Sequence, residues 1–336
     1  MTSPAFQKVV ILGSGSWGTA LAVLSERMGA EVTIVGRSQE TLDDINQDHQ
    51  NTEYLPGVHL SERITASSEL SVCQEADLIL FVIPTSATRN VAEKLNQSGI
   101  RKKTVLLSCS KGIERDTSKR MSQIIAETFP ENPIAVMSGP NHAEEIARGL
   151  PAAATIACPS ADTCSRLQHF YNSERFRIYT SHDTAGVELG GALKNIFAIA
   201  AGAASGMKLG DNAVAALATR SLREMIRLGT ALGGESETFV GLSGLGDLMT
   251  TCFSPHSRNF RVGVGLAEGH KLKQVTERLG MVAEGVPNTL SIHQAARSHG
   301  VRTPIVDIVY SMLYEDVAPH LALEKLYDLT PRQELE

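Results

Sequence analysis

Three glycines near the start of the chain have the spacing of a phosphate-binding turn. Gly13, Gly15 and Gly18 form a G-x-G-x-x-G pattern after a short β-branched run and before a helix-forming segment. In this pattern the first glycine permits a tight turn, the second lets backbone approach a pyrophosphate, and the third lets the helix lie close on the strand. The free N–H groups and dipole of the helix would face the phosphates. We interpret the stretch as a dinucleotide-binding turn and not as a plain glycine-rich loop.

The end of the second predicted strand, residues 31–35, indicates which dinucleotide is bound. An acidic residue there would bind the ribose 2′-OH of NAD, whereas an arginine can accommodate the 2′-phosphate of NADP. The chain has Gly36-Arg37-Ser38 at this place, without an acid. We therefore expect NADP(H) to be preferred over NAD(H). The alternatives are that Arg37 stacks on adenine or is a solvated surface charge.

A lysine and a pair of glycines are expected on one face of a helix in the second half of the chain. On a helix, Gly190 and Gly191 lie one turn below Lys194 on the same face. Paired glycines cost helix stability, so they make sense where a ligand or another domain must come close. The alternative is a helix start or kink beside a lysine whose charge reaches solvent.

A second stretch of this half is dense in hydrogen-bonding groups. Three glycines precede Asp247, two threonines follow it, and Ser257-Arg258-Asn259 comes shortly after. Arg258 can hold a phosphate bidentately, with Ser257, Asn259 and helix N–H groups beside it. Asp247 could orient a lysine or bind a substrate hydroxyl. The alternative is an N-cap at Asp247 and a surface arginine.

Two kinds of segment must position these groups. Apolar runs alternate with helical intervals in the first half, which predicts an α/β, Rossmann-type, doubly wound and mostly parallel sheet over residues 1–185. The predicted strands are 8–12, 31–35, 64–66, 77–83, 104–108, 134–137, 153–157 and 177–180, with helices over 19–28, 39–48, 88–97, 117–129, 143–148 and 161–171.

An all-α domain is predicted over residues 186–336. Its helices are 187–204, 212–232 capped by Asp211, 259–268, 272–279, 286–299, 304–313 and 320–327. In the second of these, Arg220, Arg223 and Arg227 share the side opposite an apolar stripe, and we interpret them as a solvated face and not as a ligand site.

Composition excludes several classes of protein. The net charge of −6 argues against a nucleic-acid surface. Five cysteines without a C-x-x-C pair fit buried thiols in a reducing cytosol, and no signal peptide is recognised, so we expect a cytoplasmic protein. The most apolar later stretch, residues 196–204, is too short for stable membrane insertion. The ten histidines lack metal-ligand spacing, so no metal is expected.

Several short motifs occur together and in a fixed order. They are Gly13-Ser14-Gly15-Ser16-Trp17-Gly18-Thr19-Ala20, Ser110-Lys111-Gly112, Ser138-Gly139-Pro140, Leu193-Lys194-Asn195, Gly246-Asp247-Leu248, Thr250-Thr251-Cys252, Ser257-Arg258-Asn259 and Glu284-Gly285. Through these motifs the chain resembles the NAD(P)-dependent glycerol-3-phosphate dehydrogenases of the bacterial type, and the resemblance covers nearly the whole chain.

The resemblance implies interconversion of sn-glycerol 3-phosphate and dihydroxyacetone phosphate for phospholipid synthesis, and it implies site residues. Lys194 is similar to the family's acid/base lysine. Residues similar to its substrate contacts are Lys111, Gly139, Asn141, Lys194, Asp247, Ser257, Arg258 and Asn259. Residues similar to its nucleotide contacts, with the glycines of the turn, are Gly13, Gly15, Ser16, Trp17, Gly18, Arg37, Lys111, Ala143, Arg258, Val282 and Glu284. Asn141-His142 departs from the hydroxyl residue and aromatic of many relatives, which leaves a backbone contact at 141 as the expectation.

The implied chemistry is a hydride transfer assisted by Lys194. The protonated lysine would donate a proton to the developing alkoxide, and the neutral lysine would remove it in reverse. Burial beside Lys111 would lower the pKa of Lys194, and Asp247 would oppose that shift. A homodimer through the helical domain is expected. Two alternatives remain: a β-hydroxyacid dehydrogenase resembling the 6-phosphogluconate or hydroxyisobutyrate enzymes, and a non-catalytic nucleotide sensor on the same fold.

Overall fold

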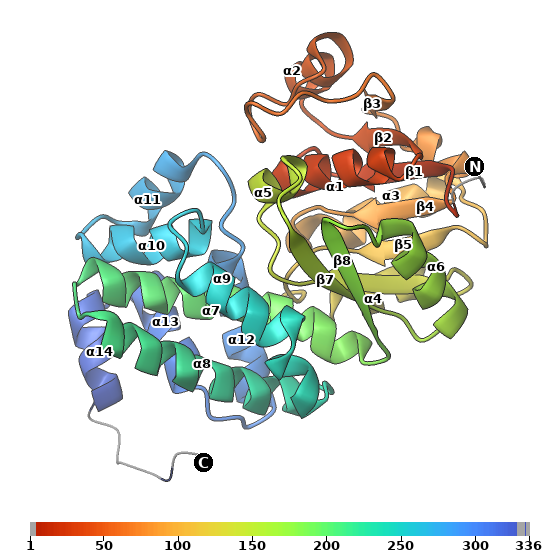
Figure 1. Cartoon of the computed structure of the whole chain (residues 1–336). Helices are drawn as coiled ribbons and strands as arrows, with labels where there is room; N and C mark the ends of the chain where they lie inside the picture. The colour runs from red at the N-terminus through yellow and green to blue at the C-terminus, as the bar shows by residue number, and fades with distance from the viewer. Residues whose placement is uncertain (1–4, 328–332, 334–336) are drawn as a thin grey trace. The chain divides into compact units, whose positions relative to one another are not determined.

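The apolar runs of the first half form one eight-stranded sheet in a computed structural model, which describes residues 5–327 and residue 333 (Figure 1). The strand order is β3-β2-β1-β4-β5-β6-β7-β8, and every neighbouring pair is parallel except β6 with β7. The bounds are β1 (Lys8–Leu12), β2 (Glu31–Val35), β3 (Ile64–Ser67), β4 (Leu78–Phe81), β5 (Val105–Ser108), β6 (Ile134–Ser138), β7 (Ala152–Ala157) and β8 (Phe176–Ser181). The order of β3-β2-β1-β4-β5-β6 is that of a dinucleotide fold, so the predicted class is confirmed.

Successive side chains of the central strands enter two different cores. Val9 and Ile11 of β1 pack in one buried cluster, whereas Val10 and Leu12 pack in another on the opposite face. Each face is covered by helices, which explains why these strands are apolar throughout instead of alternating with polar residues. The helical elements of this part are α1 (Ser16–Arg27), α2 (Gln39–Asp43), η1 (Asp44–Asp48), η2 (Leu70–Glu75), η3 (Thr85–Ala87), α3 (Thr88–Ser98), α4 (Met121–Thr128), α5 (Ala143–Ala147) and α6 (Ala161–Tyr171).

Two predicted helices of this half differ from the structure for backbone reasons. The helix expected from residue 117 begins only at Met121, because Asp116 and Ser118 have left-handed φ values of 69° and 56°. The helix expected over 39–48 is interrupted, since α2 passes into the π-helical turn η1 and ends at His49, whose φ is 51°.

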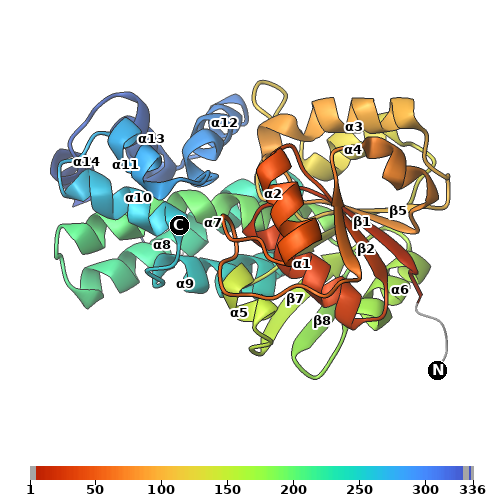
Figure 2. The ribbon, with the colours of Figure 1, turned by 90° about the horizontal axis from the view of Figure 1, so that it is seen from above.

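From Thr184 onward, the residues that the structure describes form helices and no strand, around the 23-residue α7 (Thr184–Gly206), whose residues 186–204 are all buried (Figure 2). The others are α8 (Asp211–Ala231), η4 (Ser236–Val240), η5 (Leu242–Gly246), α9 (Asp247–Cys252), α10 (Arg258–Ala267), α11 (Leu272–Leu279), α12 (Gly285–Ser298), α13 (Pro304–Tyr314) and α14 (Pro319–Tyr327). The predicted all-α composition is confirmed. The predicted cap at Asp211 is wrong, because Gly210 occupies the N-cap position and Asp211 is the first helical residue.

Close backbone approaches hold the helices around α7. A Cβ on Gly202 of α7 would lie 2.0 Å from the carbonyl oxygen of Phe260, and one on Gly263 of α10 would lie 2.0 Å from that of Ile199. Only glycine fits at such a crossing. The start of α10, where Arg258 and Asn259 lie, is thereby fixed against α7.

The chain divides into two compact units that are not continuous in sequence. The first comprises the chain up to Ser110 together with Met121–Thr184, and the second comprises Lys111–Arg120 together with the chain from Ala185. The excursion of Lys111–Arg120 has no signal in the apolar pattern, which assigned these residues to the first domain. The predicted domains, 1–185 and 186–336, stay a prediction about the parts that fold independently.

One helix of the described chain, α7, has the length and apolar composition of a membrane span, and the whole of that apolar window is buried inside the protein. The predicted burial of the thiols is confirmed, since all five cysteines are buried.

Candidate active site

The glycine turn of the first unit has the geometry that its spacing predicts. Gly13 has a φ of +119°, and a Cβ there would lie 2.3 Å from the carbonyl oxygen of Val82. A Cβ on Gly18 would lie 2.0 Å from the carbonyl oxygen of Gly13, so α1 can approach the turn only because residue 18 lacks a side chain. A Cβ on Gly15 would meet no described atom within 4 Å. This open space at the start of α1 fits the close approach of a ligand's phosphates.

A buried amide that the sequence analysis did not single out supports the turn. The Asn51 side chain is fully buried, and its Nδ2 donates to the carbonyl of Ser14 at 2.8 Å and to Thr19 Oγ1 at 2.7 Å. Its Oδ1 accepts from the backbone N–H of Tyr54 at 3.2 Å. Asn51 thus connects the loop after η1 to both sides of the glycine turn. No local sequence signal marks it, since an asparagine in a loop is ordinarily a turn residue.

Arg37 follows β2 as an exposed side chain, close enough to Tyr54 for its charge to lower that phenol's pKa. The nearer Glu53 outweighs it and, together with burial, holds the pKa of Tyr54 above its ordinary value. Ser38, the next residue, caps α2 by accepting from the backbone N–H of Thr41 at 3.3 Å. The exposed cation therefore lies at the strand end where the ribose of a dinucleotide is expected.

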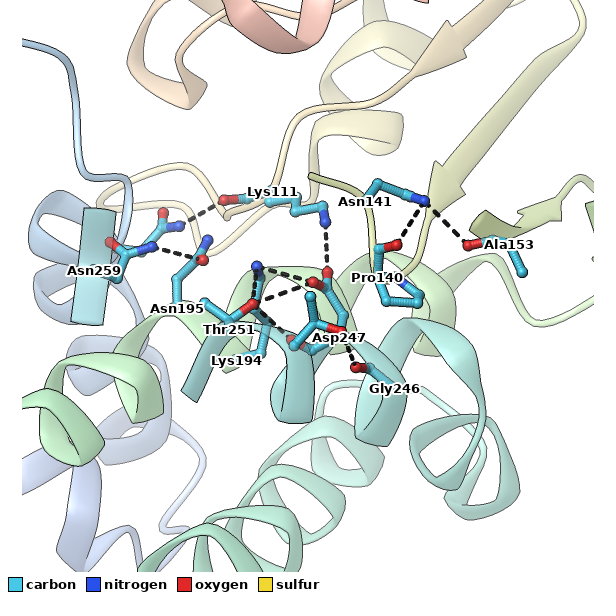
Figure 3. Close-up of polar contacts among 12 residues, drawn as sticks. Lys111, Pro140, Asn141, Ala153, Lys194, Asn195, Gly246, Asp247, Thr251 and Asn259 are labelled. Carbon is cyan, nitrogen blue, oxygen red and sulfur yellow. Dashed lines mark hydrogen bonds and ion pairs between the residues drawn. The ribbon is translucent and has the colours of Figure 1, made fainter. Parts of the chain in front are cut away.

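The end of β6 carries Gly139 and Asn141. A Cβ on Gly139 would lie 2.9 Å from the carbonyl oxygen of Ala153, which makes glycine necessary beside β7. The Asn141 amide donates to the carbonyls of Pro140 and Ala153 at 3.0 and 3.1 Å (Figure 3). Its amide hydrogens are thus engaged by backbone, which is consistent with a contact made by the main chain at 141.

Two lysines of the second unit converge on one carboxylate (Figure 3). Lys111 Nζ lies 2.5 Å from Asp247 Oδ2, and Lys194 Nζ lies 3.0 Å from Asp247 Oδ1. The side chains of Lys194 and Asp247 are only 9% and 3% exposed, and that of Lys111 is 17% exposed. The sequence analysis expects all three residues in the substrate site, and the structure brings them into contact.

Thr251 completes this cluster and was not predicted as a site residue. Lys194 Nζ donates to Thr251 Oγ1 at 2.6 Å, and Thr251 Oγ1 lies 2.6 Å from the carbonyl oxygen of Asp247, one turn earlier on α9. A hydroxyl has one proton, so Thr251 donates it to that carbonyl and accepts from the lysine. The threonine therefore fixes the direction of the ammonium group.

A glycine on α7 explains how Asp247 reaches Lys194. A Cβ on Gly190 would lie 2.7 Å from the carbonyl oxygen of Ser243, so the turn η5 rests directly on the α7 backbone. Asp247 begins α9 immediately after η5. The close approach expected at Gly190 is therefore present, but it is made by a segment of the same unit.

Burial and neighbouring charge act in opposite directions on Lys194. Burial lowers its pKa most, the negative charge of Asp247 raises it, and Lys111 lowers it further, with a result of about 8 against an ordinary 10.5. Burial would raise the pKa of Asp247, but the two lysines outweigh it and hold that pKa below its ordinary value. Near neutral pH the carboxylate is therefore ionised, and the Lys194 ammonium can lose its proton easily.

The Ser257-Arg258-Asn259 motif opens α10. Ser257 is its N-cap and accepts from the backbone N–H of Phe260 at 3.2 Å. Arg258 Nη1 donates to the carbonyl of Val282 at 3.0 Å. Asn259 is buried, and it donates to Asn195 Oδ1 at 2.8 Å and accepts from the backbone N–H of Gly285 at 2.9 Å. Asn259 thus joins α7, α10 and α12, a positioning task that its expected substrate contact did not include.

A hydrogen bond to its backbone carbonyl fixes the position of Lys111. Its carbonyl accepts from Asn288 Nδ2 of α12 at 2.7 Å, and a Cβ on Gly112 would lie 2.2 Å from Asn288 Oδ1. Glycine at 112 therefore lets Asn288 reach this carbonyl. Asn288 was missed by the sequence analysis, because a buried amide has no local signature, and Asn195 was recognised only as part of a motif, without a role.

The remaining predicted nucleotide contacts are spread over both units. Ser16 is buried at the start of α1, and Trp17 packs partly buried against the core of the first unit. Ala143 is the buried first residue of α5. In the second unit, Val282 is 51% exposed, and Glu284 precedes α12 at its N-cap. Their contacts with a nucleotide stay predictions. No group of three or more histidine, cysteine or acidic side chains among residues 5–327 and 333 is placed to hold a metal ion.

Comparison with known proteins gives the same assignment along nearly the whole chain. The family described as NAD-dependent glycerol-3-phosphate dehydrogenase N-terminus matches residues 8–164, and that described as its C-terminus matches residues 183–324. The glycerol-3-phosphate dehydrogenase [NAD(P)+] of Desulfitobacterium hafniense is 40% identical over 98% of this chain and 93% of its own. That of Enterococcus faecalis is 45% identical over 92% of both chains. The crystal structure of glycerol-3-phosphate dehydrogenase from Coxiella burnetii has a TM-score of 0.94 and 37% identity, covering 97% of this chain and 100% of its own.

Proposed function

The chain belongs to the NAD-dependent glycerol-3-phosphate dehydrogenase family of NAD(P)-dependent oxidoreductases, and from this premise we propose that it interconverts sn-glycerol 3-phosphate and dihydroxyacetone phosphate with Lys194 as the general acid and base. The observation that carries the proposal is the buried contact of Lys194 with both Asp247 and Thr251. A lysine whose pKa is near the working pH can both give and take a proton.

The residues fit a bound dinucleotide. Gly13 and Gly18 leave no room for a Cβ, whereas the position of a Cβ on Gly15 is open at the start of α1. The N–H groups at this helix start would hold the pyrophosphate, and Arg37 would hold the ribose side. The nicotinamide, when bound, supplies the hydride for C2 of the ketone and accepts it from C2 of the alcohol.

The chain's own residues handle the proton. In reduction, the Lys194 ammonium gives one proton to the C2 oxygen as it gains negative charge, and in oxidation the neutral amine takes that proton from the C2 hydroxyl. Asp247 keeps part of the lysine population protonated, and Thr251 orients the Nζ hydrogens. Lys111 contributes a second positive charge beside the same carboxylate, where it stabilises the developing alkoxide.

The substrate phosphate is assigned to the start of α10. Ser257, the N-cap, and Arg258 supply a helix N-terminus and a guanidinium group, which together favour a dianionic phosphate. Asn259 holds this helix start against α7, so the phosphate site and Lys194 are fixed by the same packing.

We also propose NADP(H) as the preferred cofactor, cytoplasmic location, supply of glycerol 3-phosphate for phospholipid synthesis, and a homodimer through the helical part. Arg37→Gln tests the first of these. Loss of a charge-assisted contact to the 2′-phosphate should raise KM for NADPH by about tenfold or more and leave KM for NADH nearly unchanged. Equal changes for both cofactors would contradict the preference.

The reaction is tested by the loss of NADPH or NADH absorbance with dihydroxyacetone phosphate, beside a panel of β-keto acids. Rapid oxidation with dihydroxyacetone phosphate alone is the expected result. Turnover of a keto acid instead would favour the β-hydroxyacid dehydrogenases. Tight NADPH binding without turnover of any compound would favour a nucleotide sensor.

A further inference from the structure

A cavity of about 320 Å³ lies in the second unit between α8, α13 and α14, and none of its lining residues belongs to the proposed active site. Arg220 and Arg227 of α8 and Arg302, just before α13, line it together with apolar side chains such as Leu217 and Leu326. The volume lies at the low end of the range for small-molecule sites. The α8 arginines, interpreted above as a solvated face and not as a ligand site, are half-buried in the structure, and two of them line this cavity.

The cavity residues of α8 form one stripe with two chemical halves. Ala213, Leu217, Arg220, Glu224 and Arg227 all line the cavity, and their spacings of four and three place them on a single helix face. The first two are apolar and the last three are charged. From Ala213 to Arg220 the helix rises by seven residue steps, or about 10 Å.

The charged half is cationic overall. Its one carboxylate, Glu224, is only 2% exposed and accepts from the backbone N–H groups of Ile305 and Val306 at 3.0 and 2.8 Å, so it serves the start of α13. Arg227 Nη1 donates to the carbonyl of Arg302 at 3.0 Å, which brings these two arginines together. Burial lowers the pKa of Arg227, Glu224 opposes this, and Arg302 and Arg220 lower it further. Positive charges thus gather at one end of an apolar cavity.

We propose that this cavity binds a single-chain amphiphile with one carboxylate head group. The chain lies along Ala213 and Leu217, and the carboxylate lies against Arg220, Arg227 and Arg302. A guanidinium group has five N–H donors, so it can contact a carboxylate beside its other partners, while the apolar wall removes the chain from water.

Calorimetric titration of the full protein with octanoate tests the proposal. The chain of octanoate matches the apolar half in length, and we expect saturable one-to-one binding. Acetate should bind at least tenfold more weakly, because it lacks the chain, and octylammonium should not bind, because its charge is reversed. Absence of saturable octanoate binding, or equal binding of octylammonium, would overturn the proposal.

Variants separate this cavity from other sites. Arg220→Gln with Arg302→Gln should weaken octanoate binding at least tenfold, whereas Arg278→Gln, an exposed arginine on α11 outside the cavity, should not. Ala213→Leu fills the apolar half at little cost in helix propensity, so it should also weaken binding even if the double variant fails to fold. Unchanged affinity in Ala213→Leu, or displacement of octanoate by glycerol 3-phosphate, would place the ligand elsewhere and refute the assignment.

Discussion

Lys194 Nζ lies 3.0 Å from Asp247 Oδ1, and both side chains are buried against α7 and α9 of the helical unit. The contact leaves the lysine with a pKa of about 8, because burial outweighs the attraction of the carboxylate. An acid/base group with such a pKa is close to both of its protonation states at the pH of a cell.

The two directions of the reaction should depend on pH in opposite ways. Reduction of dihydroxyacetone phosphate needs the Lys194 ammonium, so kcat/KM should fall by about tenfold per pH unit above the lysine's pKa of about 8. Oxidation of glycerol 3-phosphate needs the neutral amine, so its kcat/KM should rise up to that pKa and then level off. Steady-state rates between pH 7 and 10, above the titration of the substrate phosphate near 6, measure both limbs.

Asp247→Asn provides the control for this pH dependence. Asp247 raises the pKa of Lys194 more than any other group does. Without its charge, kcat/KM for reduction should begin to fall at a lower pH. If kcat/KM for reduction fell at the same pH in the variant, a group other than Lys194 would be the one that titrates.

Gly190→Ala should damage the site without touching a reacting group. The new Cβ would lie 2.7 Å from the carbonyl oxygen of Ser243, so η5 must shift and Asp247 with it. We expect a loss of roughly 1–3 kcal/mol in the free energy of unfolding and a fall in kcat of at least tenfold. Ala200→Gly on the same helix is the matched control, since it costs about 1 kcal/mol of helix propensity but should leave kcat unchanged.

Asn51→Ala should weaken nucleotide binding by loosening the glycine turn. It removes the donors to the half-buried carbonyl of Ser14 and the buried hydroxyl of Thr19 and leaves these acceptors without the amide, at roughly 1–3 kcal/mol. A rise of about tenfold in the NADPH dissociation constant, measured by fluorescence titration, is expected. Asn46→Ala removes two hydrogen bonds to Ala66 at an exposed position and should not change that constant.

Glu224 should make the protein less stable as the pH rises. Burial raises its pKa to about 7 from an ordinary 4.5, although the N–H groups of Ile305 and Val306 lower it. The folded state therefore binds the proton more tightly, and this group's contribution to stability is lost between about pH 4.5 and 7, by roughly 3 kcal/mol.

Urea unfolding at pH 5 and pH 8 measures this dependence. The free energy of unfolding of Glu224→Gln, relative to that of the unsubstituted protein, should be higher at pH 8 than at pH 5. Glu237→Gln, at an exposed position on η4, should show no such change. A constant difference for Glu224→Gln would contradict the raised pKa.

The sequence predicted the elements whose signals are local. All eight strands were found within two residues of their ends, because buried apolar runs and flanking turns mark them. The roles of Gly13 and Gly18 in the turn followed from their spacing, and the two-lysine cluster with Asp247 followed from the family resemblance. The helices η5 and α9 were missed, since residues 242–252 have no apolar period and depend on Gly190, far away in sequence.

Buried polar side chains were the other omission. Asn51, Thr251 and Glu224 each act on backbone or side chains distant in sequence, so their neighbours in the chain give no indication of their role. The start of α4 was misplaced because left-handed residues, here Asp116 and Ser118, are not restricted to glycine.

The most direct test of the account is the single-turnover rate of NADPH oxidation by dihydroxyacetone phosphate in Lys194→Ala, measured at pH 7 with the NADPH dissociation constant determined in parallel. Loss of the general acid should lower the rate by at least 100-fold while NADPH binding stays within about threefold of the unsubstituted protein. A near-normal rate with intact NADPH binding would show that Lys194 does not carry the proton.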